Sequence, residues 1–291
     1  MNALPKLLNL RKVHCSGNKE LIVRMLQTVH SYAPRLQRLS LVYKSHLSTA
    51  DHAIDIEVPV FKHLTHFAIS SDGGNSSSVH TFLAQSRDTL RSLSINNPRW
   101  RFPTEAISVR HLTQIEFSGC FSTDTQAFSE ILANGHQVES LMLSGTLECT
   151  PSSLFRKYRT ALPFLRHFSL TITNLHRHIA DRELCPAISE FLRERMQLRT
   201  YHLLVPPTDA RRIGFDASAW GVLPALSNLS CLSITYPKDL SPALAGWLIP
   251  RTVRALTLDL SHAVTEDFMA FMNVSLAYHC FPSFFYHLLL V

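Results

Sequence analysis

A six-residue pattern, apolar-x-x-apolar-x-apolar, returns ten times along the chain and constrains its fold more than any other feature. Successive first positions lie 22 to 33 residues apart, with a mean of 27. A period of this length is typical of a repeat array, because no single unit can bury its apolar side alone. The anchors are Leu10-Val13-Cys15, Leu36-Leu39-Leu41, Leu64-Phe67-Ile69, Leu90-Leu93-Ile95, Leu112-Ile115-Phe117, Val138-Leu141-Leu143, Leu165-Phe168-Leu170, Leu198-Tyr201-Leu203, Leu229-Leu232-Ile234 and Val253-Leu256-Leu258.

The last two anchors of each unit are two residues apart, which predicts a strand that turns one face to a core. Between the strands the apolar spacing becomes helical. In residues 19–32 the apolar side chains fall on one side of a helix, and residues 122–134 and 188–192 show the same spacing. The stripes are Leu21, Ile22, Met25, Leu26 and Val29, then Phe128, Ile131 and Leu132, then Ile188, Phe191 and Leu192.

Three helix starts carry a proline at the first helical position, where its missing N–H has no partner to lose: Pro151, Pro186 and Pro242. Strands that alternate with helices at short spacing require parallel pairing and right-handed crossovers. The sequence therefore predicts an α/β fold, a single curved solenoid of about ten repeats with the strands inside and the helices outside.

These units resemble the leucine-rich repeat family, in particular its long, ribonuclease-inhibitor-like β/α repeats, over residues 4–265. The family's asparagine, five residues after the second anchor, is present here only as Asn18. Without an asparagine ladder to satisfy backbone groups at the bends, we expect a less regular coil. The uneven repeat lengths make the chain similar to the substrate-binding regions of fungal F-box proteins.

The expected organisation is a solenoid over residues 1–265, followed by a capping helix and apolar tail over residues 266–291. Residues 268–291 contain no Asp, Glu, Lys or Arg, and are long enough to cross a bilayer. Pro282 would break a helix there, and no basic cluster flanks the segment. We expect a helix that caps the last repeat, with a C-terminal membrane anchor and a truncated C-terminus as alternatives.

The composition indicates a folded protein, with 46% hydrophobic and 17% charged residues. The net charge of +6 is mild and no run of basic residues stands out, which disfavours nucleic acid as a partner. Six cysteines without a C-x-x-C pair indicate a reducing compartment, and no signal segment is recognised at the start. The predicted location is the cytoplasm or nucleus.

No motif for catalysis, metal or cofactor binding emerges from the sequence. The densest histidine group, His176 and His178 with Cys185 beyond them, lacks the companion ligands of a metal site and is interpreted as a solvated loop. Phosphate-binding, dinucleotide and nucleophile-elbow motifs are missing as well. We therefore expect a protein that is not an enzyme and needs no cofactor.

The inner, concave wall of the predicted solenoid is the candidate binding site, because residues that alternate with the anchors face outward from it. Its side chains are mostly small or hydroxylic, and basic groups gather toward the N-terminal repeats. Serine and threonine could equally be ordinary strand formers on a solvated face. The candidate partner-binding residues are Lys12, His14, Arg38, Ser40, His66, Ser94, Glu116, Met142, Ser169 and His202.

These patterns predict non-catalytic recognition of a protein partner, with an acidic stretch of the partner over Lys12 and Arg38. The resemblance implies a substrate receptor of a cullin-type ubiquitin ligase. Because the first repeat begins almost at once, we expect no F-box in this chain, so ligase recruitment would need one supplied elsewhere. The alternative is a stand-alone interaction scaffold with no link to ubiquitin.

Overall fold

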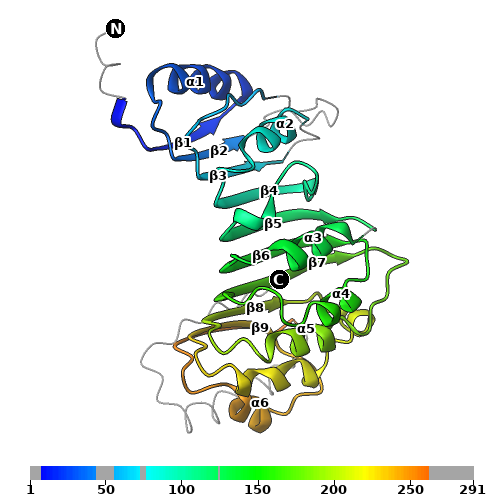
Figure 1. Ribbon diagram of the computed structural model, residues 1–291. Coiled ribbons are helices and arrows are strands. Elements are labelled where there is room, and N and C mark those ends of the chain that lie inside the picture. Colours follow the sequence, from blue (N-terminus) through cyan, green and yellow to red (C-terminus); the bar gives the residue numbers. More distant parts are fainter. Residues whose placement is uncertain (1–7, 44–55, 73–76, 124, 262–291) are drawn as a thin grey trace.

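The computed structural model describes residues 8–43, 56–72, 77–123 and 125–261, which form an α/β fold built on one ten-stranded parallel sheet. The strands lie in the order in which they occur along the chain, so each pairs only with its neighbours in sequence (Figure 1). The predicted all-parallel pairing is confirmed. The strands are β1 (Lys12–Gly17), β2 (Arg38–Tyr43), β3 (His66–Ser71), β4 (Ser92–Arg101), β5 (Gln114–Phe121), β6 (Ser140–Leu147), β7 (His167–Leu175), β8 (Thr200–Leu204), β9 (Cys231–Thr235) and β10 (Ala255–Asp259).

Helices connect most of the strands, but the connections differ from one unit to the next. The α-helices are α1 (Lys19–Tyr32), α2 (Ser77–Ser86), α3 (Gln126–Asn134), α4 (Ser152–Lys157), α5 (Leu184–Leu192) and α6 (Pro242–Leu248). The 3-10 helices η2 (Val109–His111), η3 (Ala210–Ile213) and η4 (Ala217–Ala225) take their place before β5 and β9. Before β3, residues 56–61 contain no helix.

The helix predictions hold in outline, with corrections in four helices, α1, α3, α4 and α5. The α1 bounds match the predicted residues 19–32, but Leu21 is 53% exposed and only Ile22, Leu26 and Val29 are buried. The α3 helix begins at Gln126, four residues later than predicted, because Thr125 before it has a left-handed backbone conformation. Pro242 begins α6 behind the capping side chain of Ser241, as predicted.

The other two prolines do not occupy the first position of their helices. Pro151 lies just before α4, and Pro186 is the third residue of α5. Both positions are tolerated for the reason given above, because the first backbone N–H groups of a helix have no partner within it.

The anchors form the core. All thirty are buried except Leu10, Val13 and Leu258, which lie in the first and last strands or beside them and are partly buried against the core. The second anchors are in register across neighbouring strands, as for Leu93, Ile115 and Leu141. Each buried side chain of this size contributes about 1.5–3 kcal/mol relative to exposure, so the repeated pattern accounts for the stacking of units.

A chain of aromatic contacts runs through the middle of this core. Neighbouring rings have centroids 5.0–6.4 Å apart, in tilted or edge-to-face arrangements that aromatic quadrupoles favour. The chain connects Phe102, Phe117, Phe121, Phe128, Phe155, Phe191, Phe168 and Tyr201 in this order. The chain of rings begins at Phe102, directly after β4, and ends at Tyr201 in β8.

In place of an asparagine ladder, other buried polar side chains accept hydrogen bonds from backbone N–H groups at the strand ends. Asp209 accepts a hydrogen bond from the backbone N–H of Leu175, at 3.1 Å. Thr235 accepts one from the N–H of Val205, at 3.0 Å. Asn18 has a different role, because its side chain caps α1. In these two units the backbone groups at the bends are satisfied by different residue types, which fits the expected irregularity.

The sheet runs from β1 to β10 within the predicted 1–265 unit. The predicted capping helix, apolar tail and membrane anchor of residues 266–291 lie outside the described residues.

Candidate functional site: the open face of the sheet

One face of the sheet carries a continuous column of side chains that alternate with the buried anchors. The register places its ten members side by side, one from each strand. We call this the open-face column: His14, Ser40, Ala68, Ser94, Glu116, Met142, Ser169, His202, Ser233 and Thr257. His14 and Glu116 are exposed and the other eight are half-buried.

The structure brings all ten predicted site residues onto this face. Seven of them belong to the open-face column. Lys12, Arg38 and His66 lie two residues earlier in their strands, and they are in register with one another across β1, β2 and β3. Because side chains two residues apart in a strand point to the same side, these three groups flank the column at its N-terminal end.

Hydroxyl and imidazole groups on this face bond to each other between strands. The Nδ1 atom of His14 lies 3.0 Å from the Ser40 hydroxyl, and Nδ1 of His167 lies 3.0 Å from the Thr200 hydroxyl. Such pairs fix side chains of adjacent strands, while the hydroxyl oxygens retain further acceptor capacity. The face is therefore ordered and able to hydrogen-bond a ligand.

Positive charge dominates the N-terminal end of the face. Among the described residues, no acidic side chain lies within ion-pair distance of Lys12 or Arg38. Partial burial and the charge of Arg38 lower the pKa of His66, so the neutral form of this imidazole is favoured next to Arg38. An anion bound beside Arg38 would offset the effect of the Arg38 charge on the pKa of His66.

The C-terminal half of the open-face column carries no Lys, Arg, Asp or Glu. Burial lowers the pKa of His202, which favours its neutral form. Met142 in β6 is paired with the exposed Glu116 of β5 on one side and with Ser169 of β7 on the other. The face thus changes from cationic at β1–β3 to neutral beyond β5.

The histidine group considered for metal binding does not assemble a site. The rings of His176 and His178 lie 5.6 Å apart on exposed residues, while Cys185 is buried and its thiol pKa is raised by burial. Within the described part of the chain, no three His, Cys, Asp or Glu side chains are grouped to hold a metal ion.

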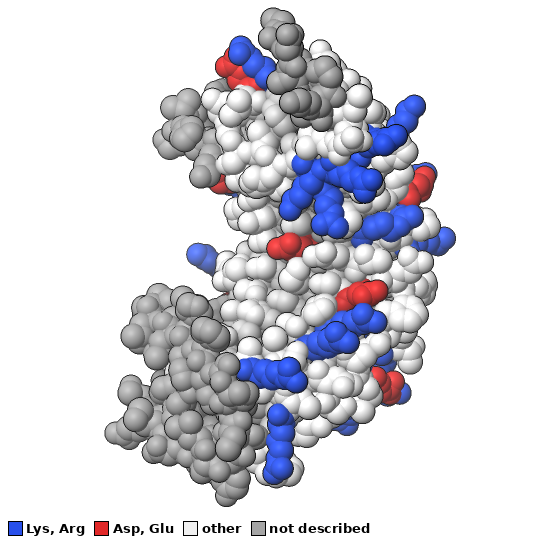
Figure 2. Space-filling model, turned by 90° about the vertical axis from the view of Figure 1, so that its left-hand side faces the viewer, with Lys and Arg blue, Asp and Glu red and all other residues white. Residues whose placement is uncertain are grey.

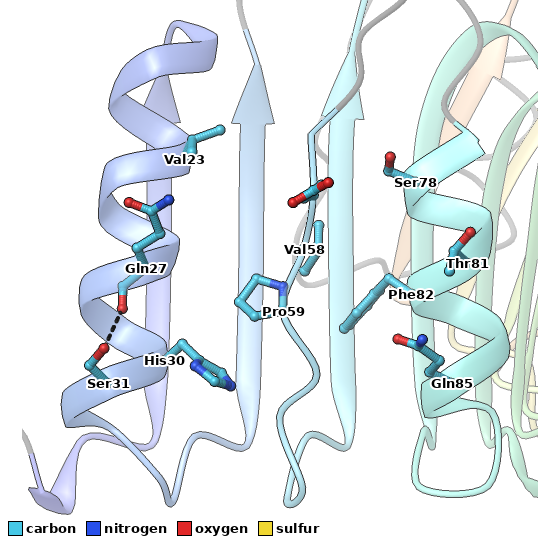
Figure 3. Close-up of a pocket in the computed structure, with 11 residues that line it drawn as sticks. Val23, Gln27, His30, Ser31, Val58, Pro59, Ser78, Thr81, Phe82 and Gln85 are labelled. Atoms are coloured by element: carbon cyan, nitrogen blue, oxygen red, sulfur yellow. Dashed lines mark hydrogen bonds between the residues drawn. The ribbon is translucent and has the colours of Figure 1, made fainter.

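A pocket of about 580 Å³ lies between α1 and α2 (Figure 3). Residues 56–61 form no helix, which leaves α1 and α2 facing each other across Val58 and Pro59. Sequence reasoning missed this pocket, although a proline at position 59 and the lack of helical spacing around it were visible. The lining residues are Val23, Gln27, His30, Ser31, Glu57, Val58, Pro59, Ser78, Thr81, Phe82 and Gln85.

Comparison with models of known protein families and with curated proteins finds no match to this chain. Among the residues that the structure describes, no helix has the length and apolar character needed to cross a bilayer.

Proposed function

We propose that the protein is a non-catalytic recognition scaffold, a solenoid of the leucine-rich-repeat type that binds a protein partner on the open face of its sheet. The sequential strand order and the recurring buried anchors support a solenoid, since each unit packs only on its neighbours. The observation that carries the functional proposal is the ten-membered open-face column, which presents a continuous ordered surface across every strand.

The proposed ligand is an extended protein segment that crosses the strands. Small side chains such as Ser40, Ser94 and Ser169 let another backbone approach closely, and their hydroxyls can pair with its amide and carbonyl groups. Lys12 and Arg38 supply a cationic end that selects an acidic stretch of the segment. The neutral half around Met142 accepts an apolar side chain of the partner.

A photo-crosslinking amino acid placed at Met142 tests this proposal in cells. We expect a discrete crosslinked protein with the probe at Met142, and none with a matched probe at Arg24, an exposed residue of α1. The double reversal Lys12→Glu with Arg38→Glu should weaken the Met142 crosslink. The matched reversal Arg193→Glu with Lys238→Glu, outside the open face, should leave it unchanged. Equal crosslinking at Met142 and Arg24 would contradict recognition by this face.

The connection to a ubiquitin ligase rests on the family resemblance alone. Proximity labelling in the cytoplasm and nucleus tests it, because a substrate receptor should label adaptor and cullin subunits. A labelled partner set that contains neither, together with a positive Met142 crosslink, would favour the stand-alone scaffold.

A further inference from the structure

The edge of the sheet at which the strands begin forms a second continuous surface, which adjoins the open face and shares Lys12, Arg38, His66 and His167 with it. A ladder of hydrogen bonds runs along this edge, in which one residue per unit donates its N–H to the carbonyl of the unit before, at 2.7–2.9 Å. We call it the strand-start ladder: Arg11, Gln37, Thr65, Arg91, Thr113, Glu139, Arg166, Arg199, Ser230 and Arg254. With strands about 4.8 Å apart, its nine intervals span about 43 Å.

Positive charge is concentrated along this edge. We define the strand-start edge as the five-residue segments centred on the first anchors: 8–12, 34–38, 62–66, 88–92, 110–114, 136–140, 163–167, 196–200, 227–231 and 251–255. These segments hold eleven of the 28 Lys and Arg residues but only two of the 22 Asp and Glu residues. Their net charge of +9 exceeds that of the whole chain, +6, so the rest of the protein is slightly acidic.

The cations of the edge are accessible, and almost all of them lack an acidic partner among the residues that the structure describes. All eleven are exposed. Within the described residues, only Arg166 is ion-paired, through a 3.5 Å contact with Glu139. Figure 2 shows Lys and Arg side chains gathered over the upper part of one side of the molecule and continuing at intervals below, with few acidic side chains among them. Unpaired cations held in a row attract a chain of negative charges.

Ring side chains lie between these cations. Five of the sixteen histidines fall in the strand-start edge: His63, His66, His111, His136 and His167. Phe164 is next to Leu165, the first anchor of its unit, and is 54% exposed. Phenylalanine and histidine rings stack on unpaired bases, so rings placed among cations favour a nucleic-acid strand.

We propose that the strand-start edge binds single-stranded nucleic acid, with the phosphates along the arginine row and bases stacked on the exposed rings. A duplex fits less well, because its bases are already stacked and cannot stack on the exposed rings. Along the sequence these cations recur about once per repeat, so no basic run reveals them. Only the parallel register gathers them into a stripe.

Fluorescence anisotropy with a labelled oligothymidylate, about 20 nucleotides long so that it exceeds a typical single-strand site, tests the proposal. We expect binding by the full chain that weakens steeply with salt. The triple variant Arg91→Gln, Arg199→Gln, Arg254→Gln avoids Lys12 and Arg38, so failure here is distinct from failure of the open-face proposal. At about 0.7 slope units per phosphate contact, its log–log salt slope should fall by about 2 and its affinity at about 0.1 M salt about 100-fold.

The matched control Arg177→Gln, Arg193→Gln, Lys238→Gln removes the same charge from exposed positions outside the edge and should bind as the unaltered protein does. Phe164→Ala should weaken binding at least about fivefold. Trp247→Ala, at a 76%-exposed residue of α6, should have no effect.

Several results would overturn the proposal. They are undetectable oligonucleotide binding, equal weakening by the control triple variant, and tighter binding of a polyglutamate peptide or of duplex DNA. Unchanged unfolding midpoints of the variants ensure that a loss of binding is not a loss of fold.

Discussion

Truncation of Leu141 tests the register on which both proposed surfaces depend. Leu141 is 1% exposed and lies between Ile115 and Phe168 in the neighbouring strands. Leu141→Ala removes about three methylene equivalents, or about 2.4 kcal/mol of transfer free energy at about 0.8 kcal/mol each. The cavity left in a packed core raises the loss of unfolding free energy to about 2–5 kcal/mol.

The adjacent residue supplies the control. Met142 lies on the open face and is half-buried, so Met142→Ala should cost less than about 1 kcal/mol. Urea unfolding followed by circular dichroism measures both variants, with the midpoint and slope compared with those of the unaltered protein. Equal losses for the two variants, or a loss below about 1 kcal/mol for Leu141→Ala, would refute the assigned inward and outward faces.

Two further predictions concern the backbone and the pH dependence of stability. Gly145 has a φ of 148°, and an added Cβ would lie 1.7 Å from the carbonyl oxygen of Gly119. Gly145→Ala should therefore lower the unfolding free energy by more than about 1 kcal/mol. Gly221→Ala is the control, because a Cβ added there meets no atom within 4 Å and should cause no such loss. Thermal melts of the two variants measure the difference. Burial lowers the pKa of His202, so the unfolded chain binds the proton more readily and stability should fall as pH drops through about 6.5. In His202→Gln, the urea unfolding midpoint should therefore fall less between neutral and mildly acidic pH than in the unaltered protein. An unchanged pH dependence would contradict the role of His202.

The apolar anchors made the sheet predictable, because period-two spacing fixes which side of a strand is buried. They also gave the outward residues, so the ten members of the open-face column could be predicted before their register was known. The three anchors that are only partly buried, Leu10, Val13 and Leu258, belong to the first and last units, each of which pairs with one other strand among the described residues.

The connections were less predictable, because their geometry depends on tertiary contacts rather than on local spacing. Leu21 has the spacing of a buried helix residue but is exposed, since the stripe of α1 that meets the sheet is narrower than the apolar stripe of its sequence. Asp209 and Thr235 satisfy backbone groups from positions that no repeat pattern marks. The roles of Asp209 and Thr235 therefore become visible only in the folded structure.

The strand-start edge was overlooked for another reason. Its signal was present, since aligning the units on their first anchors places arginine directly after the anchor in five of ten, as at Arg91 and Arg199. Along the chain these residues are separated by whole repeats, so they form no basic run. In an array with one strand per unit, similar residues at one position become spatial neighbours.

The aromatic chain from Phe102 to Tyr201 has a consequence for how the molecule comes apart. Because each ring touches the next, loosening one of these side chains removes contacts from both of its neighbours. We therefore expect the central units to melt as one cooperative block. The outer units, β1–β2 and β9–β10, lie beyond this chain and can fray while the centre stays intact.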